Sequence, residues 1–280
     1  MVEHRPWLTF LTHAVLIIGC LIIAFPIYIT FVASTHTLED ITTSFPLFPG
    51  DQLVENYTRA LSVGSKDVGA TVGTMMFNSM IMALGITFGK IFISLLAAYA
   101  IVYFRFPFRM FFFWLIFITL MLPVEVRILP TYKVAADLKI LDSYLGLIFP
   151  LIASATATFL FRQFFLTIPD ELCEAARIDG AGPIRFFFDV LLPMSRTSIA
   201  ALFVILFIYG WNQYLWPLLI TNDESYYTVL IGIKRMLDVG EGQAEWHIIM
   251  ASAMLAMIPP VLVVIFMQKQ FVKGMTETEK

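Results

Sequence analysis

Three charged side chains stand inside or at the edge of strongly apolar stretches of this sequence: Lys90, Glu125 and Arg127. A charge at membrane depth is costly, so such residues are candidates for function. Lys90 or Arg127 could attract an anionic group of a small molecule, and the planar fork of an arginine suits phosphate or carboxylate. The alternatives are structural: Lys90 extends its long stem to a nearby interface, and Glu125 and Arg127 form ion pairs with each other or with a partner subunit.

A second polar group interrupts an apolar run at Trp211, Asn212 and Gln213. The two amides could form hydrogen bonds between helices or line a substrate path. The aromatic residues Trp211, Tyr214 and Trp216 could form a belt at the membrane interface or stack on a sugar or polyol. Both interpretations stay open at this point.

Motifs for independent catalysis are missing from the sequence. It contains neither the G-x-x-x-x-G-K-[ST] loop of ATP-binding proteins nor the G-x-S-x-G elbow of hydrolases. The histidines are scattered, and the cysteines, Cys20 and Cys173, give neither a metal pair nor a disulfide framework. We therefore predict that the chain is not an enzyme and holds no cofactor. A membrane-embedded enzyme built on Glu125 and Arg127 is the alternative.

A long polar interruption between two apolar runs contains Glu174, Ala175 and Ala176, followed by Gly180. The small alanine side chains would let another surface approach the backbone closely. We expect a short helix, a break at Gly180 and Gly182, and a second short helix.

Local signals set the expected ends of these two helices. Thr167 is predicted to be the N-cap of the first helix, with Asp170 completing a capping box. Pro183 fits the first turn of the second helix.

The composition indicates a membrane protein. Hydrophobic residues make up 59% of the 280 residues and charged residues only 14%, whereas soluble domains carry about a quarter charged residues. The net charge of −3 gives no indication of nucleic-acid binding. Since lipid requires internal satisfaction of backbone hydrogen bonds, we predict an all-α polytopic membrane protein.

Six apolar windows are long enough to cross a bilayer, and a polar loop is predicted at 167–197. Lys and Arg residues are more numerous in the segments that would be cytoplasmic if both termini are cytoplasmic. The predicted spans cover about 13–33, 80–104, 111–129, 144–165, 198–220 and 246–267.

The polar loop carries a family pattern: Glu-Ala-Ala, three residues, Gly, nine residues, then aliphatic-x-Leu-Pro. This pattern resembles the EAA loop of bacterial ABC-importer permeases, which forms a cytoplasmic coupling helix that docks on the ATPase subunit. Val190 stands where the family usually has Ile. The matching positions are Glu174, Ala175, Ala176, Gly180, Leu192 and Pro193.

Other stretches extend the likeness over nearly the whole chain. The segment 142–150 and the run 211–217 resemble the second permease subunit of carbohydrate ABC importers. Segments 5–8, 121–127 and 154–165 are more similar to permeases of sn-glycerol-3-phosphate importers. Sugar permeases are usually uncharged where this chain has Glu125 and Arg127, so the likeness favours an anionic cargo.

The resemblance implies a type I ABC-importer permease fold, with residues 1–280 as one transmembrane domain in a bacterial inner membrane. The implied partners are a second permease subunit forming a heterodimer, an ABC ATPase dimer that binds ATP and Mg, and a periplasmic substrate-binding protein. The implied cargo is sn-glycerol-3-phosphate or a glycerophosphodiester. A neutral sugar or polyol is the alternative cargo, and an ATP-independent carrier or channel is the alternative class of protein.

Overall fold

The computed structural model describes residues 6–63, 68–119, 122, 124–238 and 243–276, with only the backbone of residues 6, 124, 125 and 270–276. The described residues form helices and connecting turns, and no strand occurs among them. The chain divides into two compact units, so each is described by itself. Unit 1 comprises residues 1–74 and 232–257, and unit 2 comprises residues 75–231 and 258–280.

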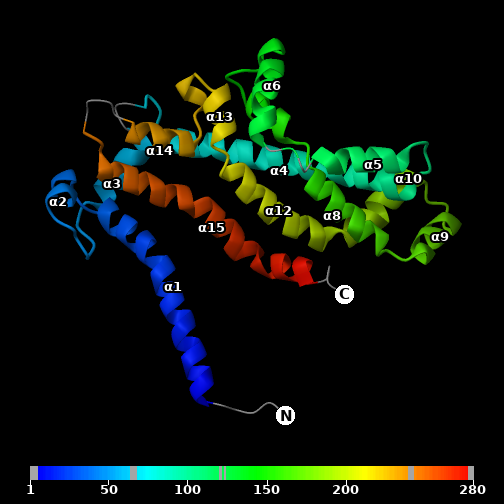
Figure 1. Ribbon diagram of the computed structural model, residues 1–280, viewed down its shortest axis with the longest axis horizontal. Helices are drawn as coiled ribbons and strands as arrows, with labels where there is room; N and C mark the ends of the chain where they lie inside the picture. Colours follow the sequence, from blue (N-terminus) through cyan, green and yellow to red (C-terminus); the bar gives the residue numbers. More distant parts are fainter. Residues whose placement is uncertain (1–5, 64–67, 120–121, 123, 239–242, 277–280) are drawn as a thin grey trace. The chain divides into compact units, whose positions relative to one another are not determined.

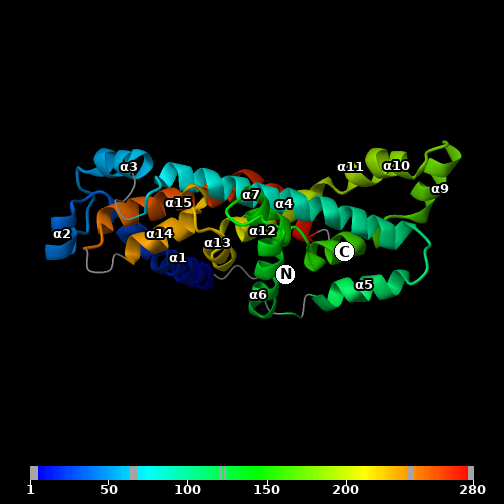
Figure 2. The same cartoon turned by 90° about the horizontal axis from the view of Figure 1, so that it is seen from above.

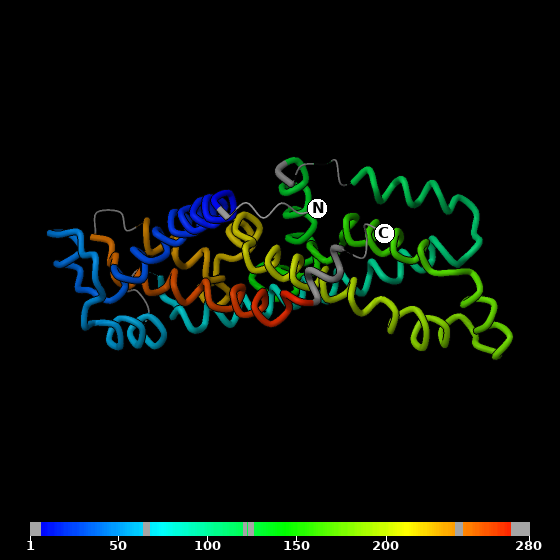
Figure 3. The backbone as a smooth tube through the Cα atoms, turned by 90° about the horizontal axis from the view of Figure 1, so that it is seen from below, coloured from blue at the N-terminus to red at the C-terminus, as the bar shows by residue number. Residues whose placement is uncertain are grey.

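Unit 1 begins with a long apolar helix, α1 (Pro6–Ser34), which contains no Lys, Arg, Asp or Glu. Figure 3 traces the chain from α1 through α2 (Leu38–Thr43) to α3 (Leu53–Ser62). Most α1 side chains are exposed in the isolated chain. A helix that is apolar on all sides belongs in lipid or against another subunit.

Polar contacts fasten α3 within unit 1. The side-chain amide of Asn56 donates hydrogen bonds to the backbone carbonyls of Ser34 and His36, each at 2.9 Å. Arg59 of α3 forms an ion pair with Glu245, which directly precedes α15 (Trp246–Thr276). These contacts tie the end of α1 and the start of α15 to one short helix.

Unit 2 is organised along α4 (Val72–Tyr103), whose middle lies beside α6 and α13 and whose C-terminal end lies near α9 and α10 (Figures 1 and 2). The remaining elements are short because the chain bends repeatedly. They are α5 (Arg109–Ile118), α6 (Val124–Asp137), α7 (Tyr144–Ile148), η2 (Phe149–Leu151), α8 (Ala155–Leu166), α9 (Asp170–Ile178), α10 (Pro183–Phe186), η3 (Phe187–Leu191), α11 (Leu192–Met194), α12 (Arg196–Trp211), α13 (Leu215–Ile220) and η4 (Glu224–Tyr226). Helix α14 (Val229–Leu237) begins in unit 2 and continues into unit 1.

Three helices of the described part of the chain are long and apolar enough to cross a membrane, and two bent helix pairs raise that number to five if each pair counts as one span. The three long helices coincide with the predicted spans 13–33, 80–104 and 246–267. The bent pairs are Tyr144–Leu151 with Ala155–Leu166, at 49°, and Pro183–Met194 with Arg196–Trp211, at 71°.

Three predicted spans are not single helices, and 144–165 is the first of the bent pairs just described. Within 111–129, α5 ends at Ile118 and α6 begins at Val124, on either side of a stretch whose proline, at position 123, lies outside the described residues. Within 198–220, α12 ends at Trp211 and α13 restarts at Leu215. Pro217 lies in the first turn of α13, where a proline fits a helix, so the break falls directly before it.

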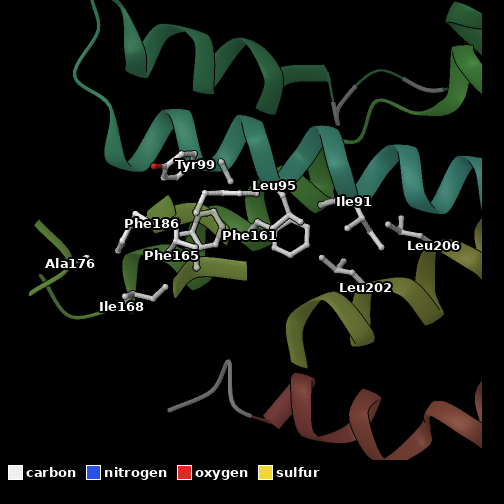
Figure 4. Close-up of a cluster of buried hydrophobic side chains, with 14 residues drawn as sticks. Ile91, Leu95, Tyr99, Phe161, Phe165, Ile168, Ala176, Phe186, Leu202 and Leu206 are labelled. Atoms are coloured by element: carbon white, nitrogen blue, oxygen red, sulfur yellow. The ribbon is translucent and has the colours of Figure 1, made fainter. Parts of the chain in front are cut away.

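A cluster of buried aromatic and aliphatic side chains joins α4, α8, α12 and the segment 176–191 (Figure 4). Phe161 and Phe165 of α8 lie at its centre, against Leu95 and Tyr99 of α4. Because lipid tails are as apolar as these side chains, such a cluster stabilises a membrane protein through close packing rather than through removal from water. The cluster therefore holds the 167–197 loop against the end of α4.

Near the N-terminal end of α4, Asn78 forms a buried polar junction. Its side-chain amide donates to the backbone carbonyls of Ser225, at 2.7 Å, and Tyr227, at 3.0 Å. Its carbonyl oxygen accepts a hydrogen bond of 2.7 Å from the hydroxyl of Tyr144. One asparagine thus connects α4, α7 and the loop after α13.

The segment 142–150 contributes a second junction. The Trp216 indole donates a 3.1 Å hydrogen bond to the Gly146 carbonyl. The Asp142 carboxylate accepts hydrogen bonds from the backbone N–H groups of Asn222 and Asp223. Segment 142–150, which carries part of the family likeness, therefore has a structural role. It joins α7 to α13 and to the loop that follows α13.

Candidate coupling surface and substrate path

The first helix of the 167–197 loop is α9, which begins at Asp170. The prediction that Thr167 caps this helix is wrong: the N-cap position is Pro169, and the Thr167 hydroxyl bonds back to the Phe164 carbonyl at the end of α8. A cap at Thr167 would make Ile168 the first helical residue, and the proline that follows Ile168 disfavours helical conformation there. Asp170 and Glu171 in the first turn of α9 complement the helix dipole.

The end of α9 is a Schellman turn centred on Gly180, which has a φ of +74°. The N–H of Gly180 donates to the Arg177 carbonyl at 3.0 Å, and the N–H of Ala181 donates to the Ala176 carbonyl at 2.9 Å. This pattern is typical of helices ended by a left-handed glycine. The predicted glycine break, and Pro183 in the first turn of α10, are both confirmed.

One side of the loop is anchored to the protein. The Tyr99 hydroxyl donates a 2.8 Å hydrogen bond to the Pro183 carbonyl, at the start of α10. Ala176 is buried together with Phe186 and Phe187 in the aromatic cluster. This anchoring fixes the direction in which the other side of α9 and α10 faces.

The other side exposes Glu174, Ala175, Ile178 and Ile184, which we call the coupling surface. Ile178 is 86% exposed and Ile184 is 75% exposed, although both lie in a polar loop. Exposed isoleucines beside a small residue and a carboxylate are suited to contact with another protein. Of the predicted residues, Glu174 and Ala175 lie on this surface and Ala176 lies beneath it.

Leu192 and Pro193 lie elsewhere, in α11 after the π-helical turn η3. Both are partly buried and line an apolar groove with Phe203 and Arg196. Pro193 lacks a backbone N–H, so the regular helical hydrogen-bonding pattern cannot continue through this position. Their place in the fold is the bend between the loop and α12, rather than the coupling surface.

Cys173 lines a pocket of about 200 Å³ between α9 and the end of α4, together with Tyr103 and Arg177. Burial raises the pKa of its thiol above the usual range, and the carboxylate of Asp170 raises it further. A thiol with a raised pKa is a poor nucleophile. Cys173 therefore contributes packing here.

The second group of predicted residues centres on Lys90 in α4, which is only 6% exposed. Its ammonium nitrogen lies 3.7 Å from the centroid of the Tyr209 ring on α12. Helices α4 and α12 approach closely at Ala83 and Gly210. A Cβ added to Gly210 would lie only 2.9 Å from the Ala83 Cα. Lys90 is therefore held inside unit 2, and the predicted extension of its stem to an interface is not what the structure shows.

Arg127 lies in α6 with an exposed side chain. Its neighbour Ile128 packs in one buried cluster with Ile86 of α4 and Tyr209 of α12, so this part of α6 lies beside the helices that carry Lys90 and Tyr209. The side chain of Glu125 lies outside the described residues, so its predicted pairing with Arg127 stays a prediction. The structure thus brings together two of the three charged residues singled out from the sequence.

The amide residues of the substrate-path prediction lie at the break between α12 and α13. Gln213 donates a 3.1 Å hydrogen bond to the Tyr209 carbonyl, next to Lys90. Asn212 is exposed and ends α12. Trp211 is buried, with its ring stacked on Phe207, so it packs against its own helix.

Tyr209 and Asn78 are the residues that sequence reasoning missed. Tyr209 precedes Gln213 by one helical turn, so the i, i+4 spacing from an already suspected amide could have indicated it. Asn78 is a single amide in an apolar helix, and its partners Tyr144, Ser225 and Tyr227 are far away in the sequence.

The sequence of residues 90–277 matches the family of binding-protein-dependent transport system inner membrane components. The chain belongs to this family, and the predicted class, an all-α ABC-importer permease embedded in the inner membrane, is confirmed.

Individual relatives extend the match over the full length. The chain is 61% identical to the sn-glycerol-3-phosphate transport system permease protein UgpE of Agrobacterium fabrum and 56% identical to that of Escherichia coli, with 100% of both chains covered in each comparison. Its fold is similar to that of a chain in a bacterial ABC transporter that imports the acidic polysaccharide alginate. The TM-score is 0.83 at 20% identity, covering 97% of this chain and 99% of the other.

Proposed function

We propose that this chain is the membrane-spanning permease subunit of an ATP-driven importer for sn-glycerol-3-phosphate, with glycerophosphodiesters as further cargo. The observation that carries the proposal is full-length identity of 56–61% to relatives named as permeases of sn-glycerol-3-phosphate transport. The cations of Lys90 and Arg127 support an anionic cargo. The chain itself carries no cofactor in this proposal, since ATP and Mg are bound by a partner ATPase.

The proposed complex contains a second permease subunit, two copies of the ATPase and a periplasmic binding protein. The coupling surface docks on an ATPase subunit, and closure of the ATPases moves α9 and α10. Because these helices are anchored to α4 through Tyr99, their movement passes directly into the long helices. The cavity then opens toward the binding protein, and it faces inward after phosphate release.

Uptake by the assembled complex tests this function. In proteoliposomes with ATP inside, we expect accumulation of labelled sn-glycerol-3-phosphate, and we expect the same compound to stimulate ATP hydrolysis. Glycerol and maltose, as neutral controls, should do neither. Uptake without the ATPase would indicate a carrier, and stimulation by a neutral polyol alone would replace the cargo assignment.

The proposed orientation places both termini and the coupling surface in the cytoplasm. In a variant lacking Cys20 and Cys173, a single cysteine at Asp51 is expected to react with an impermeant thiol reagent added to intact spheroplasts. A cysteine at Asp179, equally exposed on the isolated chain, should react only after lysis. The reverse labelling would overturn the orientation and the docking proposal with it.

A further inference from the structure

Lys90 places a positive charge in the interior of unit 2. Its side chain is buried, and the contact that the structure gives its ammonium group is the face of the Tyr209 ring at 3.7 Å. A cation–π contact offsets only part of the cost of taking an ammonium group out of water. Among the side chains that the structure describes, no carboxylate pairs with Lys90. The ammonium therefore has donors available for an anion.

A second cation lies near the same place. Arg127 stands on α6 next to Ile128, which packs in one buried cluster with Ile86 of α4 and Tyr209 of α12. Two like charges held near each other repel, and a bound anion would turn this repulsion into two attractions. Three elements contribute to this arrangement, namely α4, α6 and α12.

The two cations differ in accessibility and in chemistry. Arg127 is exposed and offers a planar fork that can bind two oxygens of one phosphate group. Lys90 is buried and offers a compact charge with rotatable donors. Gln213 donates a hydrogen bond to the Tyr209 carbonyl and lies just after the end of α12, where the regular helix breaks. This order suits an anion that is met first by Arg127 and then held by Lys90.

We propose that Lys90 and Arg127 form an anion-binding station inside the permease, which receives the phosphate group of a phosphate ester during import. This proposal rests on the proposed function, because it assigns residues to the cargo named there. Tyr209 is a positioning residue, since its ring lies against the Lys90 ammonium.

The test is the concentration of sn-glycerol-3-phosphate that gives half-maximal uptake by the reconstituted complex. Losing one charge-assisted contact is expected to raise this concentration at least about tenfold in Lys90→Gln and in Arg127→Gln. Lys90→Arg keeps the charge but has a larger, planar head group, so it should raise this concentration less than Lys90→Gln does. Lys133→Gln removes an exposed charge from the same helix as Arg127 and should have no effect.

Dependence on ionic strength separates a cargo contact from a structural role. Salt screens charge attraction at an accessible site, so the half-maximal concentration should rise with salt in the wild type. It should rise less steeply in Arg127→Gln. A variant that only loosens helix packing would keep the wild-type slope. Normal half-maximal concentrations in both Lys90→Gln and Arg127→Gln would overturn the proposal.

The main alternative to the anion-binding station is a structural role in which the cations neutralise Glu125. If Lys90 or Arg127 serves only to neutralise Glu125, the single charge removals should impair assembly, and combining them with Glu125→Gln should restore assembly and wild-type affinity. That rescue would also overturn the station. If Lys90→Gln does not assemble, Lys90→Met tests the same loss of charge with an apolar side chain of similar length.

A failure of the proposed function would give a different result from a failure of the anion-binding station. A wild-type complex that imports only neutral compounds would refute the cargo assignment whatever the variants do. The station would then be tested with inorganic phosphate alone, by its effect on the thermal unfolding of the wild type and of Lys90→Gln. A shift that is equal in both proteins, or absent from both, would refute the station as well.

Discussion

Replacing Gly146 with alanine is expected to prevent stable folding of unit 2. A Cβ at this position would lie 2.0 Å from the backbone oxygen of Ile140 and 3.0 Å from Cδ1 of Ile220. Overpacking usually costs about 1–3 kcal/mol, and the cost should lie at or above the upper end because the obstructing oxygen belongs to the backbone. Relief of the clash would move α7 and stretch the hydrogen bond from Trp216 to the Gly146 carbonyl.

The measurement is the yield and thermal unfolding midpoint of the purified chain or complex. Leu145→Ala, at an exposed position of the same short helix, is the matched control and should lower the midpoint far less. Adding Ile220→Val to Gly146→Ala removes the Cδ1 contact but leaves the contact with the Ile140 oxygen, so it should not restore stability. A midpoint of Gly146→Ala close to the wild-type value would contradict this account of segment 142–150.

The long helices could be predicted from the sequence because their signal is local. Each apolar run in α1, α4 and α15 is continuous, and hydropathy alone identifies it. The shorter spans could not be placed in the same way. A hydropathy window over 198–220 averages across the break at 212–214. The first helix ends before two amide residues, and the second begins shortly before Pro217.

Contacts between distant segments had no comparable signal. Lys90 and Arg127 were each singled out as charges at membrane depth, but their proximity depends on how α4, α6 and α12 pack. Tyr209 completes that group and carries no charge that would mark it. The failed capping prediction at Thr167 had a local cause, because the rule was applied without the effect of Pro169 on the preceding residue.

The coupling loop is where a single backbone position should affect function most strongly. Gly180 has a φ of +74°, which proline, fixed near −65°, cannot adopt. Gly180→Pro also removes the N–H that donates to the Arg177 carbonyl at 3.0 Å. We expect the Schellman turn to open and the coupling surface to lose its orientation. Uptake should fall at least about tenfold, which corresponds to about 1.4 kcal/mol of lost productive association with the ATPase.

Graded substitutions distinguish backbone conformation from side-chain bulk. A Cβ added at Gly180 or at Gly182 would have no neighbouring atom within 4 Å. Of these two glycines, only Gly180 has a positive φ. Gly180→Ala should therefore impair uptake, whereas Gly182→Ala should have little effect. Gly180→Asn should be milder than Gly180→Ala, because asparagine tolerates the left-handed region better than other residues with a side chain.

Co-purification of the ATPase and the ratio of ATP hydrolysed to cargo imported locate the defect. If the coupling surface docks as proposed, Gly180→Pro should retain less ATPase, or hydrolyse more ATP for each molecule imported. The turn around Gly180 is exposed, so its opening should lower the thermal unfolding midpoint of the permease less than Gly146→Ala does. Normal ATPase retention together with normal uptake in Gly180→Pro would show that the turn after α9 does not govern coupling. The exposed isoleucines Ile178 and Ile184 would then need another explanation.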